Sequence, residues 1–175
     1  MAIKQAAWTH GLGVELEFSS WTAFRQGFFT TVRPSAESKF GWVHFVIPTP
    51  VIVDGTRLRA ESAMVRFSTG SGAKITNFHV YGGETKIANY NGLSLSGNLQ
   101  FVREAVPNSH RVLWGTAISL GVQFTGAGPN DFIQFISAGI DFYAQRNIYL
   151  KIPCKPEVNY FITELVSSSD IVVEA

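Results

Sequence analysis

TAISLGVQF, residues 116–124, contains the pattern on which the fold depends. Ile118, Leu120, Val122 and Phe124 are large and apolar, and the residues between them are small or polar: Ala117, Ser119, Gly121 and Gln123. A period of two is typical of a β-strand with one buried face, because successive side chains point to opposite sides of a strand. This stretch therefore predicts a half-buried strand.

The same period recurs along the chain, and turn signals such as DGT (54–56) and TGSG (69–72) separate the alternating segments. It predicts about ten strands: 4–9, 12–18, 27–33, 40–47, 57–69, 73–81, 85–89, 98–105, 112–124 and 131–143. Further extended pieces are expected near 147–152, 158–165 and 170–174, and a single helical turn near 19–24. Many short strands with regular turns favour a sandwich or barrel. We expect an all-β fold, one antiparallel, jelly-roll-like β-sandwich domain over residues 1–175.

Two of these segments are apolar on both faces. In FGWVHFVI (40–47) Phe40, Trp42 and Val46 alternate with Val43, Phe45 and Ile47, and FIQFISAGIDFY (132–143) behaves similarly. A strand that is apolar on both sides needs cover on both sides. We expect a second copy of the chain to supply it, so the sequence predicts a homo-oligomer with Phe40, Trp42, Phe135 and Tyr143 in its interface.

The composition argues against several classes of function. The net charge is +1 with no run of basic residues, so no nucleic-acid partner is expected. No stretch approaches ~18 unbroken apolar residues, so no membrane span is expected. No signal peptide is recognised, which makes the cytoplasm the default location, although export without a signal peptide leaves no mark in a sequence. Nucleotide-loop, zinc-protease and paired-cysteine motifs are lacking, so neither a cofactor nor a metal is expected.

All four histidines lie beside large apolar residues. His44 is expected to be structural, with a ring nitrogen bonded to a backbone carbonyl or a side chain. His79 is the best functional candidate, because Ile75, Asn77, His79 and Tyr81 are expected to share one face of a strand, which places three polar-tipped side chains in line. The polar stretch 82–92 is the best binding loop. The predicted ligand-binding residues are Asn77, His79, Tyr81, Asn89, Tyr90 and Asn91.

Asp141 is an acid between Ile140 and Phe142. A buried carboxylate must be paired or change its protonation state, so the main expectation is an ion pair with an arginine. The alternative is a general acid or base, which would act together with His79. Gly121 and Gly139 fall inside strands, where glycine is costly, and are expected to mark bulges or the close approach of a bulky neighbour.

Four pieces of sequence carry a resemblance: WTHG (8–11), WVHFVIPTPVIVDG (42–55), VRFSTGSGAKITNFHVYGGETKI (65–87) and WGTAISLGVQF (114–124). The chain resembles a family of small uncharacterised all-β proteins with W-x-H-G, W-x-H-F-x-I-P-T-P and H-V-Y-x-G signatures, over about residues 6–143. That family has no established activity, so the resemblance implies only a β domain that stands alone.

Three hypotheses about function remain open. The first is a non-catalytic binding or assembly module that acts as a homo-oligomer. The second is a lectin-like module that binds a glycan through aromatic rings and asparagines. The third is a small enzyme of the isomerase or cyclase type, with an apolar pocket for a small apolar ligand and with His79 and Asp141 as catalytic residues.

Overall fold

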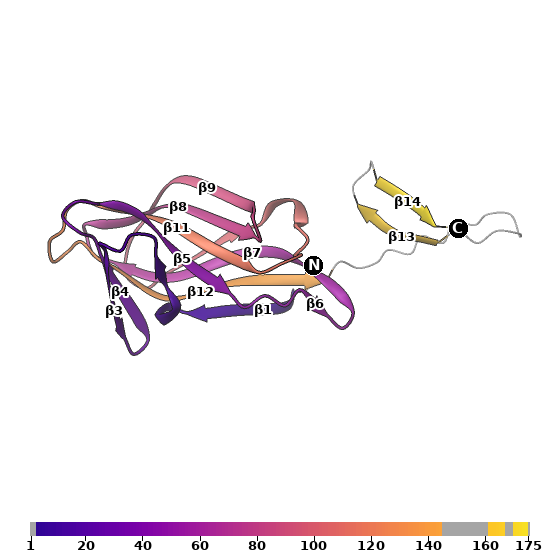
Figure 1. Cartoon of the computed structure of the whole chain (residues 1–175), viewed down its shortest axis with the longest axis horizontal. Helices are drawn as coiled ribbons and strands as arrows, with labels where there is room; N and C mark the ends of the chain where they lie inside the picture. Colours follow the sequence, from indigo (N-terminus) through magenta and orange to yellow (C-terminus); the bar gives the residue numbers. More distant parts are fainter. Residues whose placement is uncertain (1–2, 145–160, 167–169, 175) are drawn as a thin grey trace, which may run out of the picture. The chain divides into compact units, whose positions relative to one another are not determined.

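Two antiparallel sheets pack face to face in the computed structural model (Figure 1), which describes residues 3–144, 161–166 and 170–174. The seven-stranded sheet has the order β10-β7-β12-β4-β3, with β1 also paired to β12 and β6 to β7. Its strands are β1 (Ile3–His10), β3 (Thr22–Gln26), β4 (Phe29–Arg33), β6 (Ile52–Val53), β7 (Thr56–Thr69), β10 (Gln100–Ala105) and β12 (Ile133–Ala144).

The five-stranded sheet has the order β2-β5-β11-β8-β9. Its strands are β2 (Glu15–Leu16), β5 (Phe40–Ile47), β8 (Ala73–Gly82), β9 (Thr85–Leu95) and β11 (Thr116–Phe124). Two 3₁₀ turns, η1 (Gly11–Gly13) and η2 (Pro107–Ser109), are the only helical segments among the described residues. The prediction of an all-β antiparallel sandwich is confirmed.

The core lies between the sheets and is built from the apolar face of each alternating strand. Phe45, Phe78 and Leu120 of the five-stranded sheet are fully buried, as are Phe67, Phe135 and Phe142 of the seven-stranded sheet. The rings of Phe45 and Phe135 meet edge to face across the sandwich, with centroids 5.4 Å apart. Burial on this scale is the main favourable contribution to the fold.

Several predicted boundaries were wrong at strand ends. The helical turn expected at 19–24 is replaced by β3, which pairs with β4 through a turn at Gly27 (φ +42°). The strand expected at 12–18 is reduced to Glu15–Leu16, and the one expected to end at residue 89 continues to Leu95. Pairing with a neighbouring strand decides these limits, because it supplies the backbone hydrogen bonds that local sequence does not reveal.

Residues 145–175 form a separate unit, in which β13 (Phe161–Val166) pairs with β14 (Asp170–Glu174) as an antiparallel hairpin. The extended pieces expected near 158–165 and 170–174 correspond to these strands. The piece expected at 147–152 lies outside the described residues. The expectation of one domain over 1–175 stays a prediction.

The second doubly apolar segment has a different explanation from the one the sequence suggested. Pairing of β12 with β7 shifts register between Phe135 and Ser137, which leaves Ile136 as an extra residue in β12. A bulge of this kind reverses the alternation, so Phe135 before it and Ile140 after it both face the core. Phe135 and Tyr143 are already buried within one chain, so they are not free to form the predicted interface.

Candidate functional site

The outer face of the five-stranded sheet brings together most of the residues that the sequence singled out. Because Phe78 and Val80 of β8 are fully buried in the core, Asn77, His79 and Tyr81 project from the opposite face of that strand. On β5 the buried Val43, Phe45 and Ile47 leave a second set on this outer face, which consists of Phe40, Trp42, His44 and Val46.

Strand register arranges these side chains in rows across the sheet. Trp42 of β5 lies opposite Gly121 of β11, which lies opposite Asn77 of β8, and Asn77 is paired in turn with Asn91 of β9. The next row is His44, Ser119, His79 and Asn89. Residues that are 10 to 79 positions apart in the chain therefore lie next to one another on one surface.

Small residues on the central strand give Trp42 room to reach across the sheet. On this face β11 carries only Ala117, Ser119, Gly121 and Gln123. The ring of Trp42 passes over β11 and meets the ring of His79, with centroids 4.7 Å apart. The Tyr81 ring continues the series at 6.5 Å from His79, and Phe40 extends it on the other side at 6.0 Å from Trp42. We call Phe40, Trp42, His79 and Tyr81 the aromatic row.

A chain of side-chain hydrogen bonds runs beside the aromatic row. The Thr76 hydroxyl donates to Oδ1 of Asn77 at 2.7 Å, and Nδ2 of Asn77 donates to Oδ1 of Asn91 at 2.7 Å. Nδ2 of Asn91 then donates to Oδ1 of Asn89 at 3.0 Å. Each amide thus has a defined orientation, and the exposed Nδ2 of Asn89 is left as a donor at the end of the chain. We call these four residues the amide relay.

The relay also determines the tautomer of His79. Nε2 of His79 lies 2.8 Å from Oδ1 of Asn91. An amide oxygen can only accept, so Nε2 carries the proton, and in the neutral ring Nδ1 is then the acceptor. His79 itself is buried (6% exposed), whereas Asn89 and Asn91 are exposed. The site therefore combines a buried histidine, held by a hydrogen bond to Asn91, with amides that solvent can reach.

His44 behaves as predicted, since its Nδ1 lies 2.9 Å from the Ser119 hydroxyl.

Within the described part of the chain, no three His, Cys, Asp or Glu side chains come close enough together to hold a metal ion. The same residues contain no helix long and apolar enough to cross a membrane.

Tyr90 does not join the other predicted ligand-binding residues. It pairs with Phe78, whose side chain is in the core, so it lies on the other side of β9 from Asn89 and Asn91. Its hydroxyl donates to the carbonyl of Ala105 on β10 at 2.7 Å. Partial burial raises the pKa of this hydroxyl above its usual value, and the nearby Glu104 raises it further. Tyr90 thus links two strands at the edge of the sandwich.

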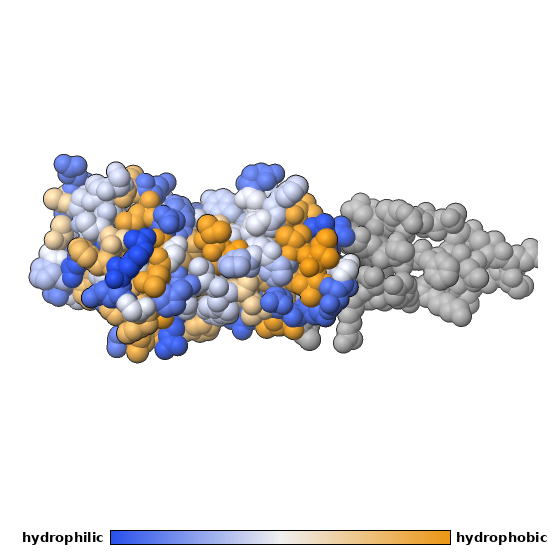
Figure 2. All heavy atoms as spheres, turned by 60° about the horizontal axis from the view of Figure 1, so that its bottom comes forward, coloured by the Kyte–Doolittle hydropathy of each residue, from blue (hydrophilic) through white to orange (hydrophobic). Residues whose placement is uncertain are grey.

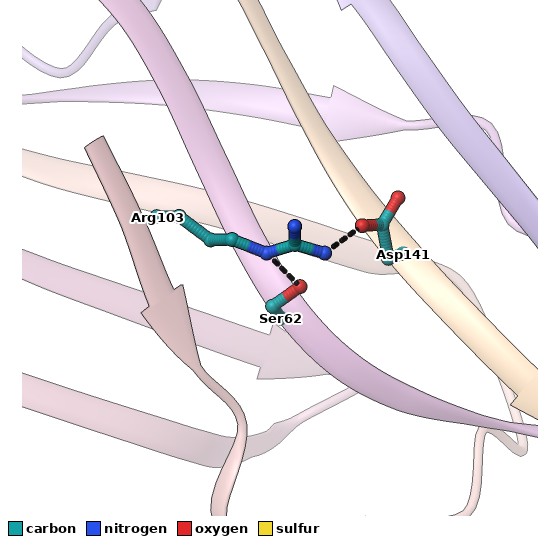
Figure 3. Close-up of polar contacts among 3 residues, drawn as sticks. All are labelled: Ser62, Arg103 and Asp141. Carbon is teal, nitrogen blue, oxygen red and sulfur yellow. Dashed lines mark hydrogen bonds and ion pairs between the residues drawn. The ribbon is translucent and has the colours of Figure 1, made fainter. Parts of the chain in front are cut away.

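Asp141 is ion-paired with Arg103, which also donates from Nε to the Ser62 hydroxyl at 2.9 Å (Figure 3). The expectation of a structural ion pair with an arginine is confirmed. Ile140 and Phe142 face the core, so Asp141 projects from the outer face of the seven-stranded sheet, on the opposite side of the sandwich from His79. His79 and Asp141 therefore do not share a site.

Sequence reasoning missed the role of Trp42, which it assigned to a subunit interface. The signal was present in the alternation of residues 40–47, because one of the two apolar faces also carries a histidine. What could not be read was the neighbour of Trp42, since the contact with His79 depends on the register of β5, β11 and β8.

Comparison with known proteins gives a fold and a family. A low-affinity xylan-binding module from Roseburia intestinalis (CBM86) matches with a TM-score of 0.52 and 9% identity, over 79% of this chain and 96% of that one. A family 29 carbohydrate-binding module from Piromyces equi matches with a TM-score of 0.46 and 11% identity, over 78% of this chain and 90% of that one. The likeness to the xylan-binding module shows the sandwich fold alone.

No curated protein matches the sequence. A family model does match it, over residues 2–145, which is nearly the whole sandwich. The expectation of an uncharacterised family is thereby confirmed: the chain belongs to a family of unknown function, DUF6623.

Proposed function

We propose that the chain is a non-catalytic module that binds an uncharged glycan on the outer face of its five-stranded sheet. The observation that carries the proposal is the aromatic row lying directly beside the amide relay. The apolar face of a sugar ring packs on aromatic side chains, and sugar hydroxyls pair with amide donors and acceptors. A binding site of a few convergent polar groups among aromatic rings is typical of small-molecule recognition.

The relay supports selection among sugar hydroxyls. Because the hydrogen bonds of the relay run in one direction, from Thr76 to Asn89, a hydroxyl near Asn89 meets a donor from Nδ2. A hydroxyl in the wrong orientation leaves a group unpaired, which costs binding free energy. The relay from Thr76 to Asn89 contains no charged group, and Lys86, whose Nζ lies 5.8 Å from the centroid of the Tyr81 ring, is the charge beside the aromatic row.

The fold supports the same proposal only at the level of analogy. The xylan-binding module with which the chain shares its sandwich binds a carbohydrate, but a shared fold does not determine function. The weight therefore rests on the residues of this face.

A homo-oligomeric module remains a second candidate, and one observation favours it. On the same face Phe40 is 45% exposed and Val46 is 70% exposed, so the face offers apolar area that a second copy could cover. A second copy would cover the residues that we assign to the glycan. The two functions therefore compete for one surface, and addition of the glycan would dissociate such an oligomer.

The test is retention of the protein on neutral polysaccharides, xylan and mannan among them, by affinity electrophoresis and calorimetry. We expect Trp42→Ala to weaken binding about tenfold or more, as for an aromatic residue at the centre of a binding site. Thr76→Val should weaken it less, because it removes only the first donor of the relay. Phe28→Ala is the matched control, since Phe28 is 61% exposed, packs on Phe29 and lies in the turn between β3 and β4, which belong to the other sheet.

The proposal is contradicted if no neutral glycan is retained, or if Trp42→Ala and Phe28→Ala bind equally well.

A further inference from the structure

A second aromatic surface lies on the other side of the sandwich. Trp8 of β1 and Phe101 of β10 are separated by the two strands β12 and β7. Their ring centroids are nevertheless only 6.4 Å apart, and their planes differ by 26°. The two side chains therefore lean toward each other across the seven-stranded sheet.

The residues of β12 and β7 that lie beneath these rings explain how the rings meet. Trp8 is paired with Gly139, and a Cβ atom on Gly139 would lie 2.4 Å from the indole ring. The ring thus rests directly on the backbone of β12, as was expected for a bulky neighbour of this glycine. Met64, next in the same row, is 2% exposed. Trp8 and Phe101 remain 41% and 55% exposed, so together they form an aromatic surface that solvent can reach.

The unpaired charge beside this surface is positive. Arg66 is exposed and lies directly opposite Phe101 in the β7–β10 register, on the same face. Asp141 in a neighbouring row is already paired with Arg103, whose side chain reaches from β10 across β7 (Figure 3). Among the described residues, Arg66 has no carboxylate partner. A free guanidinium at the edge of an aromatic surface is suited to a ligand that joins a ring to an anion.

We infer that Trp8, Phe101 and Arg66 form a second binding site, which takes an acidic sugar residue. The flat apolar face of the sugar ring would lie on Trp8 and Phe101, and its carboxylate would accept hydrogen bonds from Arg66. The polar groups of Arg103 and Ser62 lie in the adjoining rows and are available to hydroxyls. Figure 2, which turns the β1 and β12 side forward, shows apolar surface in separate patches with polar surface between them. Such a surface suits a small ligand better than a broad protein interface.

This site is independent of the proposed function. Its residues belong to the seven-stranded sheet, and the sandwich core separates them from Trp42 and His79. It also differs in chemistry, because an arginine here takes the place of the neutral amide relay. The full chain would then carry one face for neutral sugars and one for acidic sugars.

The experiment compares polygalacturonate and alginate with fully methyl-esterified polygalacturonate. The ester keeps the sugar ring and removes the charge, so it isolates the part played by Arg66. We expect the intact chain to bind both polyuronates, to bind the ester at least about threefold more weakly, and to lose affinity as salt rises, since exposed charges are screened.

Variants locate the site. Phe101→Ala and Trp8→Ala should weaken polyuronate binding about tenfold, and Arg66→Gln about twofold to fivefold with no effect on the ester. Phe101 is on an edge strand and more than half exposed, so its variant tests the site even if Trp8→Ala unfolds the sheet. Trp42→Ala is the control and should leave polyuronate binding unchanged.

Three results overturn the inference: neither polyuronate binds, the ester binds as well as the acid, or Trp42→Ala abolishes binding while Phe101→Ala does not. The last result would assign acidic sugars to the first face and leave the proposed function standing. Loss of neutral-glycan binding alone would reject the proposed function and leave this second site intact.

Discussion

At the scale of single residues, two glycines show how the sheets tolerate close approach. Gly121 faces the Asn77 side chain, and pairing of β11 with β8 shifts register just after it. Gly139 lies under Trp8. Both therefore match the expectation of a bulge or a bulky neighbour. In each case the missing Cβ makes room for a side chain of one of the two outer faces.

Replacement of Gly121 by valine should therefore destabilise the fold. A Cβ atom at this position would lie 2.6 Å from Oδ1 and 2.9 Å from Cβ of Asn77, so the amide relay must move. Overpacking of this kind typically costs about 1–3 kcal/mol. Urea unfolding measures the change, with Gly115→Ala as the control, because a Cβ there meets nothing within 4 Å. Equal midpoints for the two variants would contradict the prediction.

Asp131 provides a second prediction at this scale, which concerns acid stability. Oδ2 accepts from the backbone N–H of Gly128 at 2.9 Å, and Oδ1 accepts from the N–H of Gly126 at 2.8 Å and from the Thr125 hydroxyl at 3.0 Å. These bonds, that from Gly128 first, lower the pKa of the carboxyl below its ordinary value of 3.8, and burial opposes them only in part.

A lowered pKa in the folded state means that the ionised carboxylate stabilises the fold. This contribution is fully present above pH 3.8 and is lost as the pH falls through the lower pKa of the folded state. Asp131→Asn should thus be less stable than the natural chain at neutral pH, and the difference should shrink as the pH falls below that value. Urea midpoints between pH 2 and pH 7 test this; a constant difference would speak against it.

At the scale of elements, the ion pair between Arg103 and Asp141 joins β10 to β12 across β7. The carboxylate is 8% exposed, whereas the arginine is 46% exposed, so the two partners are not equivalent. Removal of the arginine alone leaves the buried carboxylate of Asp141 without a partner. Removal of both charged groups leaves no buried charge.

We therefore expect Arg103→Met to be more destabilising than the double variant Arg103→Met with Asp141→Asn. The exposure of Arg103 limits the single effect to about 1–3 kcal/mol, because water can still reach that side of the pair. A double-mutant cycle in urea measures the coupling. Additive effects of the two substitutions would show that the pair does not stabilise the sheet.

At the scale of the whole molecule, the chain divides into residues 1–144 and 145–175, and the family match ends at residue 145. If residues 1–175 form one domain, the second unit should stabilise the first. If the two units fold separately, removal of the second should leave the first equally stable. We expect a chain that ends at Ala144 to unfold at the same temperature as the full chain, as followed by circular dichroism. A clearly lower melting temperature would favour one domain.

The expectation of self-assembly is tested at the same scale. Of the two doubly apolar segments behind it, one has another explanation, since the bulge in β12 turns Phe135 and Ile140 toward the same core, and only the β5 face remains. Light scattering of the full chain at micromolar concentration measures the mass directly. A mass of 19.2 kDa would leave the glycan as the occupant of that face. A larger mass that Val46→Lys reduces to one chain would assign the face to a second copy.

The sequence by itself determined which residues share a face. Alternation is a local property of an extended chain, so the grouping of Asn77 with His79 and Tyr81, the outward side of β5 and the all-β fold could all be predicted. Even there two extra residues misled the prediction, because a bulge reverses the alternation and is invisible in the pattern. Ile136 is the extra residue in β12, and Thr76 in β8 puts Ile75 in the core although it was expected on the face of Asn77.

Only the tertiary structure decided which side chains from different strands come into contact. Trp42 joins His79, and Asn91 joins Asn77, because three strand registers bring them together. Trp8 meets Phe101 across two intervening strands, although 93 residues separate them in the chain. Register between distant strands is set by the packing of the whole core and not by any local preference. For this reason the members of the first site could be largely predicted from the sequence, whereas the second site could not.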